Sequence, residues 1–226
     1  MKENQKSRLK TIIFLVGLLG LILPMQVSAQ GKLQFGASAG LDFTMLAGTG
    51  QVHPRAGFSF QGVSSLTLME KLSLQGSLGY AFRPYHLEAT ALIFPSDVSP
   101  LPGNASSAVL DIKGSYHEFH LPILLKFHLQ STQKGPYIGA GPMAGVAIGH
   151  TGRGVLRRED GSTDNVDNLS YRAEPRLALQ AVIGHRLPLT AVTDLSVELY
   201  GNAYAGQFFL APAKNYTAGA RVGLWL

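Results

Sequence analysis

The amino-acid sequence predicts an all-β fold, an eight-stranded antiparallel transmembrane β-barrel with short periplasmic turns and longer extracellular loops. Apolar and polar residues alternate with period two, the period of a β-strand, in segments of about ten residues. Long and short connections alternate between these segments, as they do in membrane-spanning barrels. Only 15% of the 226 residues are charged, whereas soluble domains contain about 25%.

The first strand is predicted over residues 33–43, where the odd-numbered residues are apolar and Gln34, Ser38 and Asp42 lie on the opposite face. The same alternation predicts strands over residues 72–83, 118–129, 176–186, 195–204 and 216–226, and weaker alternation adds residues 55–66 and 136–149. These eight segments are the expected strands of the barrel wall.

The connections differ in length in a regular way. Residues 45–54, 84–115 and 150–170 form long links that are polar or rich in proline and glycine, and residues 207–213 form an intermediate one. Shorter links are expected at residues 69–71, 130–135 and 187–194. An even number of strands with this layout places both termini in the periplasm.

The composition of the polar face indicates which face meets lipid. A barrel in water would carry many Lys, Glu, Arg and Asp outside, but here the polar face is mainly Gly, Ser, Gln and Thr. We therefore expect the apolar face to meet lipid, while small polar residues fill a narrow interior. A soluble, lipocalin-like barrel with the faces reversed is the alternative fold. Aromatic girdles near the strand ends are expected to include Tyr80, Phe82, Tyr137, Tyr171 and Tyr216.

Three prolines fall inside the predicted strands, although proline has no N–H to donate to a neighbouring strand. We expect Pro122, Pro142 and Pro175 to mark bulges or strand starts near the rim of the barrel. If all three prolines instead lay at paired positions in mid-membrane, the predicted strand boundaries would be wrong.

The N-terminus has the pattern of a cleaved signal peptide. A basic stretch over residues 2–10 precedes an apolar run over residues 11–23, which is shorter than a membrane-spanning helix, and residues 27–29 (Val-Ser-Ala) form a small-x-small cleavage pattern. Cleavage after Ala29 would leave residues 30–226 as the barrel domain. Removing residues 1–29 takes away four Lys or Arg and one Glu, so the net charge falls from +5 to about +2. This small charge argues against a nucleic-acid partner.

Two adjacent segments carry a family resemblance. Residues 116–127 read YHEFHLPILLKF, and residues 135–142 read GPYIGAGP. Together they resemble the central hairpin of the PorT-like outer-membrane β-barrel family, in which an apolar-Pro-apolar-Leu-Lys-aromatic strand precedes a short turn, Pro-Tyr and a Gly-Pro pair. The resemblance implies an eight-stranded barrel of the outer membrane and makes Pro122 and Pro142 features of the fold. It identifies no activity, although the family's namesake assists type IX protein secretion.

Ionic residues of both signs lie on the predicted interior face. An unpaired charge in a narrow lumen is costly, so we expect a paired network that plugs the barrel. A plugged barrel has a structural or interaction role; the alternatives are a small-solute channel and a lipid-modifying enzyme. The predicted network contains Glu118, Lys126, Glu174, Arg176, Glu198 and Arg221, with Asp42, Arg55 and Arg83 as further members.

No catalytic residue, metal site or cofactor is predicted. On a strand, the two histidines of His117-Glu118-Phe119-His120 point to opposite faces, and their spacing differs from that of helical zinc motifs. The chain also has no cysteine to ligate a metal. An enzyme with its active site at the rim could use His86, His117, His150 or His185 together with Ser115, Thr151 or Ser170. None of these residues lies in a recognisable nucleophile motif.

The expected partners are outer-membrane lipid and lipopolysaccharide, together with envelope or secretion-system proteins. Because loops carry most recognition in such proteins, protein partners are expected to contact loops 84–115 and 152–170. The second of these loops contains charges of both signs, which is typical of a solvated loop.

Overall fold

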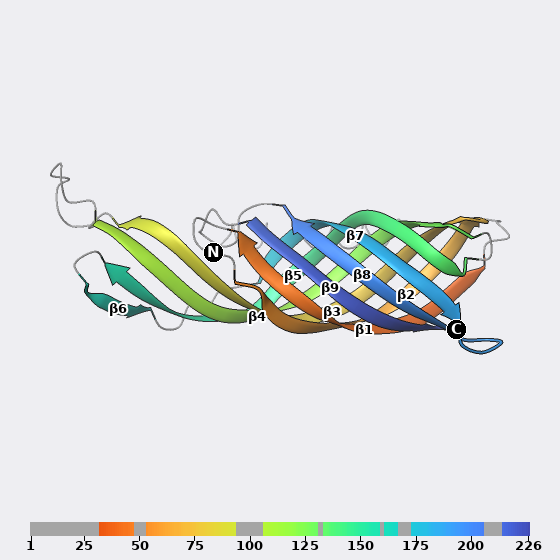
Figure 1. Ribbon diagram of the computed structural model, residues 1–226, viewed down its shortest axis with the longest axis horizontal. Coiled ribbons are helices and arrows are strands. Elements are labelled where there is room, and N and C mark those ends of the chain that lie inside the picture. The colour runs from red at the N-terminus through yellow and green to blue at the C-terminus, as the bar shows by residue number, and fades with distance from the viewer. Residues whose placement is uncertain are drawn as a thin grey trace, which may run out of the picture. The chain divides into compact units, whose positions relative to one another are not determined.

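The computed structural model describes residues 32–47, 53–93, 106–130, 133–158, 161–166, 173–205 and 214–226. Within this part of the chain, antiparallel strands form a closed barrel (Figure 1). The predicted signal peptide, residues 1–29, and Tyr171 lie outside the described residues. None of the described residues forms a helix long and apolar enough to cross a membrane.

Eight long strands and one short strand make up the sheet. Their order is β4-β3-β2-β1-β9-β8-β7-β5-β6, and an additional β4–β5 pairing closes the barrel. The short strand β6 pairs only with the outer part of β5, so eight strands form the barrel, as predicted. The strands are β1 (Leu33–Ala47), β2 (Arg55–Met69), β3 (Leu72–Ile93), β4 (Ser106–His128), β5 (Gly135–Arg158), β6 (Thr163–Val166), β7 (Glu174–Pro188), β8 (Asp194–Tyr204) and β9 (Lys214–Trp225).

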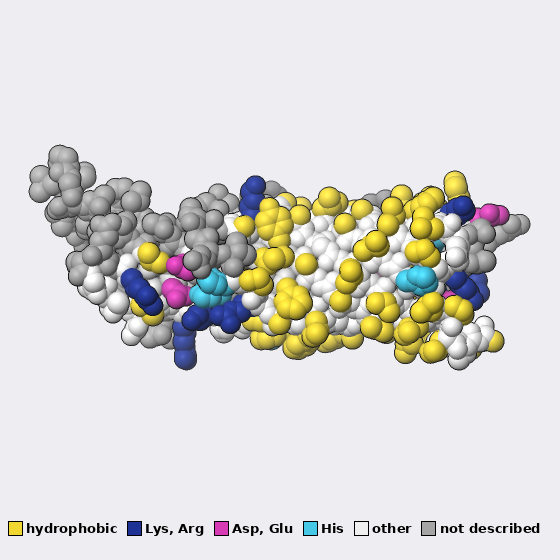
Figure 2. Space-filling model, viewed as in Figure 1, with side chains coloured by type: hydrophobic (Ala, Val, Ile, Leu, Met, Phe, Trp, Pro, Cys, Tyr) yellow, Lys and Arg dark blue, Asp and Glu magenta, His cyan; other side chains and the backbone are white. Residues whose placement is uncertain are grey.

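Side chains alternate between the two faces of the barrel wall. In β7, Leu179 is 60% exposed, whereas its neighbour Gln180 is 1% exposed. The same alternation in the other strands places leucine, phenylalanine and valine side chains outside, where they form the apolar belt seen in Figure 2. The buried side chains inside are largely polar or charged. This arrangement confirms the prediction that the apolar face points outward and the polar face points into the lumen. A soluble barrel would have the two faces reversed.

Part of the belt is aromatic, as predicted, but one expected member is elsewhere. Tyr80 contacts Phe60 and Phe119, with ring centroids 5.0 and 5.5 Å apart. Tyr137 was expected in a girdle, but it is only 2% exposed and lies in the lumen. Its neighbour Ile138 faces outward, 53% exposed, so the period-two alternation places Tyr137 inside.

Three strands continue beyond the barrel at the end opposite the short turns. The strands β3, β4 and β5 are 22 to 24 residues long, and with β6 they form what we call the outer sheet (Figure 1). The prediction of loops over 84–115 and 152–170 is therefore wrong for residues 84–93, 106–115, 152–158 and 163–166, which are strands. A bulge places Gly149 and His150 opposite Tyr116, and it interrupts the alternation on which the prediction relied.

Two of the three prolines occupy different positions from those predicted. Pro175 is the second residue of β7 and so marks a strand start. Pro122 and Pro142 lie in the middle of β4 and β5, where the pairing of β4 with β3 and of β5 with β4 breaks off and resumes in the same register. The expected bulge is therefore wrong for these two prolines: each missing N–H interrupts a ladder without shifting it.

Candidate functional site

A first ionic layer inside the barrel is centred on Arg83 of β3. Its guanidinium lies 3.2 Å from Asp42 of β1 and 3.6 Å from Glu118 of β4. The hydroxyl of Tyr204 in β8 donates to Glu118 at 2.9 Å, and that of Ser59 donates to Asp42 at 3.0 Å. The three charged side chains are at most 1% exposed. This layer thus joins five strands across the lumen, β1, β2, β3, β4 and β8.

A second ionic layer is centred on the carboxylate of Glu198 in β8. It accepts hydrogen bonds from Lys126 of β4 at 2.5 Å, from the Tyr137 hydroxyl of β5 at 2.6 Å, and from Arg221 of β9. The Lys126 ammonium also lies 4.3 Å from the centre of the Tyr137 ring, and Arg221 lies 4.7 Å from that of Tyr200. Both contacts have cation–π geometry. The charges of this layer are therefore paired and packed against aromatic rings.

Further polar side chains of the lumen form hydrogen bonds outside these two layers. Gln180 donates to Asn202 at 2.8 Å, and Asn202 donates to Thr217 at 2.7 Å. At the mouth near the short turns, Arg186 bonds Asp194 at 3.0 Å and Gln34 at 2.9 Å. A cavity of about 290 Å³ opens at this mouth, lined by Lys32, Glu70, Lys134, Asp194 and Trp225 among others.

The structure brings together most of the residues predicted for the lumen network. Glu118 belongs to the first layer, and Lys126, Glu198 and Arg221 belong to the second; Asp42 and Arg83, the further members, also lie inside. Their role as a functional site stays a prediction.

Three predicted members lie outside the two layers. Arg176 is 3.8 Å from Glu174, whose side chain is 40% exposed, and its guanidinium is 4.4 Å from the centre of the Tyr116 ring. Arg55 is exposed at the start of β2 and its guanidinium lies 3.3 Å from His86, so its placement in the lumen was wrong.

Sequence reasoning missed the tyrosines that complete the layers. Tyr116, Tyr137, Tyr200 and Tyr204 supply hydroxyl groups or ring faces to the buried charges. For Tyr200 and Tyr204, the signal is their place on the same face of β8 as Glu198.

The residues considered for catalysis have other contacts. Ser115 lies 3.4 Å from the Thr151 hydroxyl, and His117 lies 2.5 Å from the Tyr80 hydroxyl. A serine–histidine hydrogen bond joins Ser73 and His128 at 3.0 Å, but both side chains are buried inside the barrel. Among the described residues, no group of three or more His, Cys, Asp or Glu is arranged to hold a metal ion.

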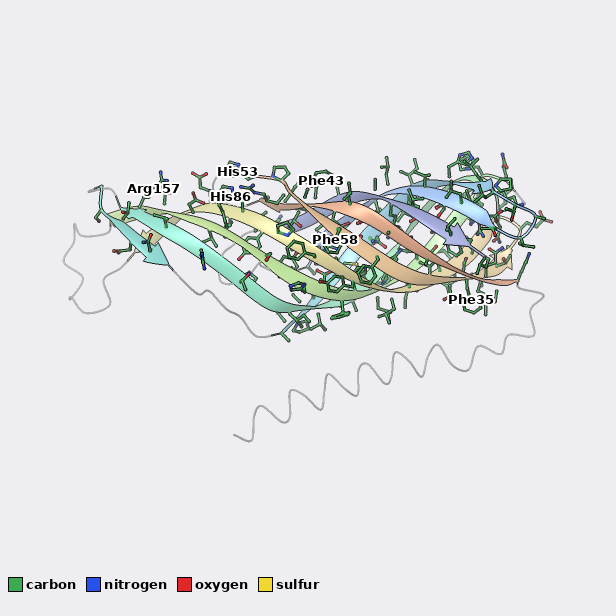
Figure 3. All side chains as sticks on the ribbon, turned by 90° about the horizontal axis from the view of Figure 1, so that it is seen from below. Phe35, Phe43, His53, Phe58, His86 and Arg157 are labelled. Atoms are coloured by element: carbon green, nitrogen blue, oxygen red, sulfur yellow. The ribbon has the colours of Figure 1, made fainter. Side chains whose placement is uncertain are left out.

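A separate charged cluster lies on the outer sheet, beyond the apolar belt. His53 and His86 stack with ring centroids 4.3 Å apart, and Figure 3 shows them between Phe58 of the belt and Arg157 near the end of β5. His86 lies 2.7 Å from Asp111 and His53 lies 3.3 Å from Glu88.

Comparison with solved structures finds small bacterial barrels. The attachment invasion locus protein Ail of Yersinia pestis, solved with the heparin analogue sucrose octasulfate, is 11% identical, with 86% of this chain and 99% of Ail covered and a TM-score of 0.44. Neisserial surface protein A is 14% identical (86% and 98% covered, TM-score 0.40). The N-terminal barrel domain of Pseudomonas aeruginosa OprF is 14% identical (87% and 100% covered, TM-score 0.40).

The family assignment comes from the sequence. No curated protein matches the chain. The model of the family described as "Outer membrane protein beta-barrel domain" matches residues 26–203, which is most of the chain. The closed antiparallel barrel and its apolar belt are those of a protein that lies in a membrane. The chain therefore belongs to the outer membrane protein β-barrel domain family, and it is an outer-membrane protein.

Proposed function

We propose that this protein is a plugged outer-membrane barrel with a structural and interaction role, and that it presents the outer sheet to partners outside the cell. The observation that carries the proposal is the pair of ionic layers. Asp42, Arg83 and Glu118 carry a formal charge of −1, and Lys126, Glu198 and Arg221 carry +1. The layers thus balance each other in a lumen that eight strands already make narrow.

Conductance tests the plug. The mature protein is reconstituted into planar bilayers, and we expect no stable single-channel currents, because both layers must open before an ion can pass. A variant with Arg83→Ser, Glu118→Ser and Asp42→Ser removes all three charges of the first layer and leaves the ion pairs of the second layer intact, and it serves as the comparison. Stable currents from the unaltered protein would instead favour the small-solute channel.

We also propose that the interaction role includes assistance to protein secretion, the role of the PorT-like family's namesake. The support is the likeness of residues 116–127 and 135–142 to that family's central hairpin, which forms the β4–β5 pair. The test deletes the gene from its host and measures exported cargo in the medium. Unchanged secretion with normal membrane integrity would contradict this part of the proposal.

No catalytic residue is assigned. The lipid-modifying enzyme would need a serine–histidine pair that lipid can reach, whereas Ser73 and His128 are 1% and 3% exposed. Incubation of the purified protein with outer-membrane lipid, followed by mass analysis of the acyl chains, tests the enzyme directly. We expect no change in the lipid.

A further inference from the structure

We propose that Lys113 and Arg153, with Arg55 beside them, form a site on the outer sheet that binds phosphate groups of outer-leaflet lipid. The inference concerns the outer wall of the protein and does not depend on whether the lumen conducts.

The first argument is the height of these residues above the apolar belt. On β4, ten residues separate Phe127 from His117, both on the outward face. At a rise of about 3.3 Å per residue and a tilt of about 40°, they span roughly 25 Å, the height of the lipid-facing band of a barrel. Lys113 lies four residues further along, about 10 Å higher by the same measures. Lys113 therefore lies above the lipid-facing band, at the level of the headgroups and not of the hydrocarbon.

The second argument is an uncompensated pair of like charges. Lys113 lies directly opposite Arg153 in the β4–β5 ladder, and both side chains are exposed. Because Gly149 and His150 bulge from β5, Arg153 emerges on the outward face that carries Ile148 lower down. Like charges directly opposite each other destabilise a sheet. Among the residues that the structure describes, neither cation has a carboxylate partner. An anion held between them would remove this cost.

The third argument concerns the neighbouring groups. The nearby carboxylates of Asp111 and Glu88 are directed to His86 and His53, at 2.7 and 3.3 Å. His86 lies opposite Lys113 in the β3–β4 ladder and also contacts the Arg55 guanidinium at 3.3 Å. Arg55 therefore brings a third cation to the edge of the pair. Figure 2 shows basic side chains gathered at the end of the apolar belt, beside the histidines.

These residue types suit a phosphate group attached to a lipid. Arginine presents a planar fork of donors that matches two phosphate oxygens, and lysine supplies a compact positive charge. Below the cations, Phe119 is 48% and Ile148 is 36% exposed. Acyl chains of a lipid whose phosphate lies between Lys113 and Arg153 would run along these apolar side chains. A soluble phosphate would gain nothing from them.

The test measures binding to the folded mature protein in detergent by native mass spectrometry. The probes are bisphosphorylated lipid A, the same lipid after removal of its phosphates, and inorganic pyrophosphate. The test variant is Lys113→Gln with Arg153→Gln. The matched control is Lys71→Gln with Lys214→Gln, which removes two exposed cations from a turn and from another strand. Heat-dependent gel mobility verifies that each variant is folded.

We expect the unaltered protein and the control to bind bisphosphorylated lipid A roughly tenfold or more tightly than the test variant, since each cation near an anionic lipid contributes separately. Removal of the phosphates from the lipid should cause the same loss. Equal affinity of the test variant and the unaltered protein would overturn the proposal. Displacement of the lipid by equimolar pyrophosphate would also overturn it, because the site would then be one for soluble phosphate.

Discussion

Glu198 is the residue on which the second layer depends. A carboxylate taken out of water needs nearby positive charge and donors, and here three donors from three different strands reach it. Removing one member of a buried charged group leaves the others uncompensated, which costs more than the pair contributes when intact. Loss of a charged member of this layer should therefore lower the free energy of unfolding more than loss of an uncharged one.

Substitution of Glu198 tests this ranking. Glu198→Gln keeps the shape but leaves Lys126 and Arg221 without their counter-charge, and we expect it to lower the free energy of unfolding by about 3–5 kcal/mol. Tyr137→Phe removes one donor to a charged acceptor and should cost less, about 1.5–3 kcal/mol. Urea unfolding in detergent, followed by tryptophan fluorescence, measures both. A smaller loss for Glu198→Gln than for Tyr137→Phe would contradict the account of the layer.

Strands β5 and β7 meet at a position where only glycine fits. Gly184 lies opposite Tyr137, and a Cβ at Gly184 would stand 2.5 Å from the Cζ atom of the tyrosine ring. The ring crosses over the neighbouring strand to reach Glu198, so the missing side chain of β7 makes space for a hydrogen bond between β5 and β8.

Replacement of this glycine is therefore expected to disturb the lumen. Gly184→Ala should displace the Tyr137 ring and destabilise the barrel by about 1–3 kcal/mol, the usual cost of overpacking. Gly62→Ala is the control, because a Cβ there meets nothing within 4 Å. The measurement is the urea midpoint of each variant. Equal midpoints would mean that the Tyr137 ring moves aside without cost.

For individual strands, the sequence predicted the positions in the barrel better than it predicted the lengths. Strict alternation located β7, β8 and β9 to within a few residues. It failed in the outer sheet, where the bulge at Gly149 interrupts the alternation of β5 and where outward side chains of β3 and β4, such as His86 and Lys113, are no longer apolar. The charges of the lumen could be predicted because they share a face, but their partners could not, since pairing depends on the stagger between strands that are distant in sequence.

For the whole molecule, closure leaves the barrel without an open edge in lipid. Each of the eight barrel strands has two neighbours, so the backbone N–H and C=O groups within the membrane are paired, apart from the breaks beside Pro122 and Pro142. The part of the sheet that lies in lipid therefore has no open edge.

Gel mobility provides a test of this closure. Unheated protein in dodecyl sulfate should keep its compact barrel and migrate faster than a boiled sample, because the closed sheet unfolds slowly. The outer-membrane fraction of a Gram-negative host supplies the protein, and a soluble periplasmic protein processed in parallel is the control. Identical migration before and after boiling would argue against a closed barrel.

The pairing of β1 with β9 has a consequence for biosynthesis. These strands lie at the two ends of the described chain, and Gly36 faces Trp225 across the seam between them. The barrel therefore remains open until the last strand emerges from the export machinery, and the first strand must wait with one row of backbone groups unpaired. Contacts between such distant segments form slowly. A chain that ends before β9 would therefore be expected to remain an open sheet whose first strand keeps one row of unpaired backbone groups, the kind of edge from which proteins aggregate.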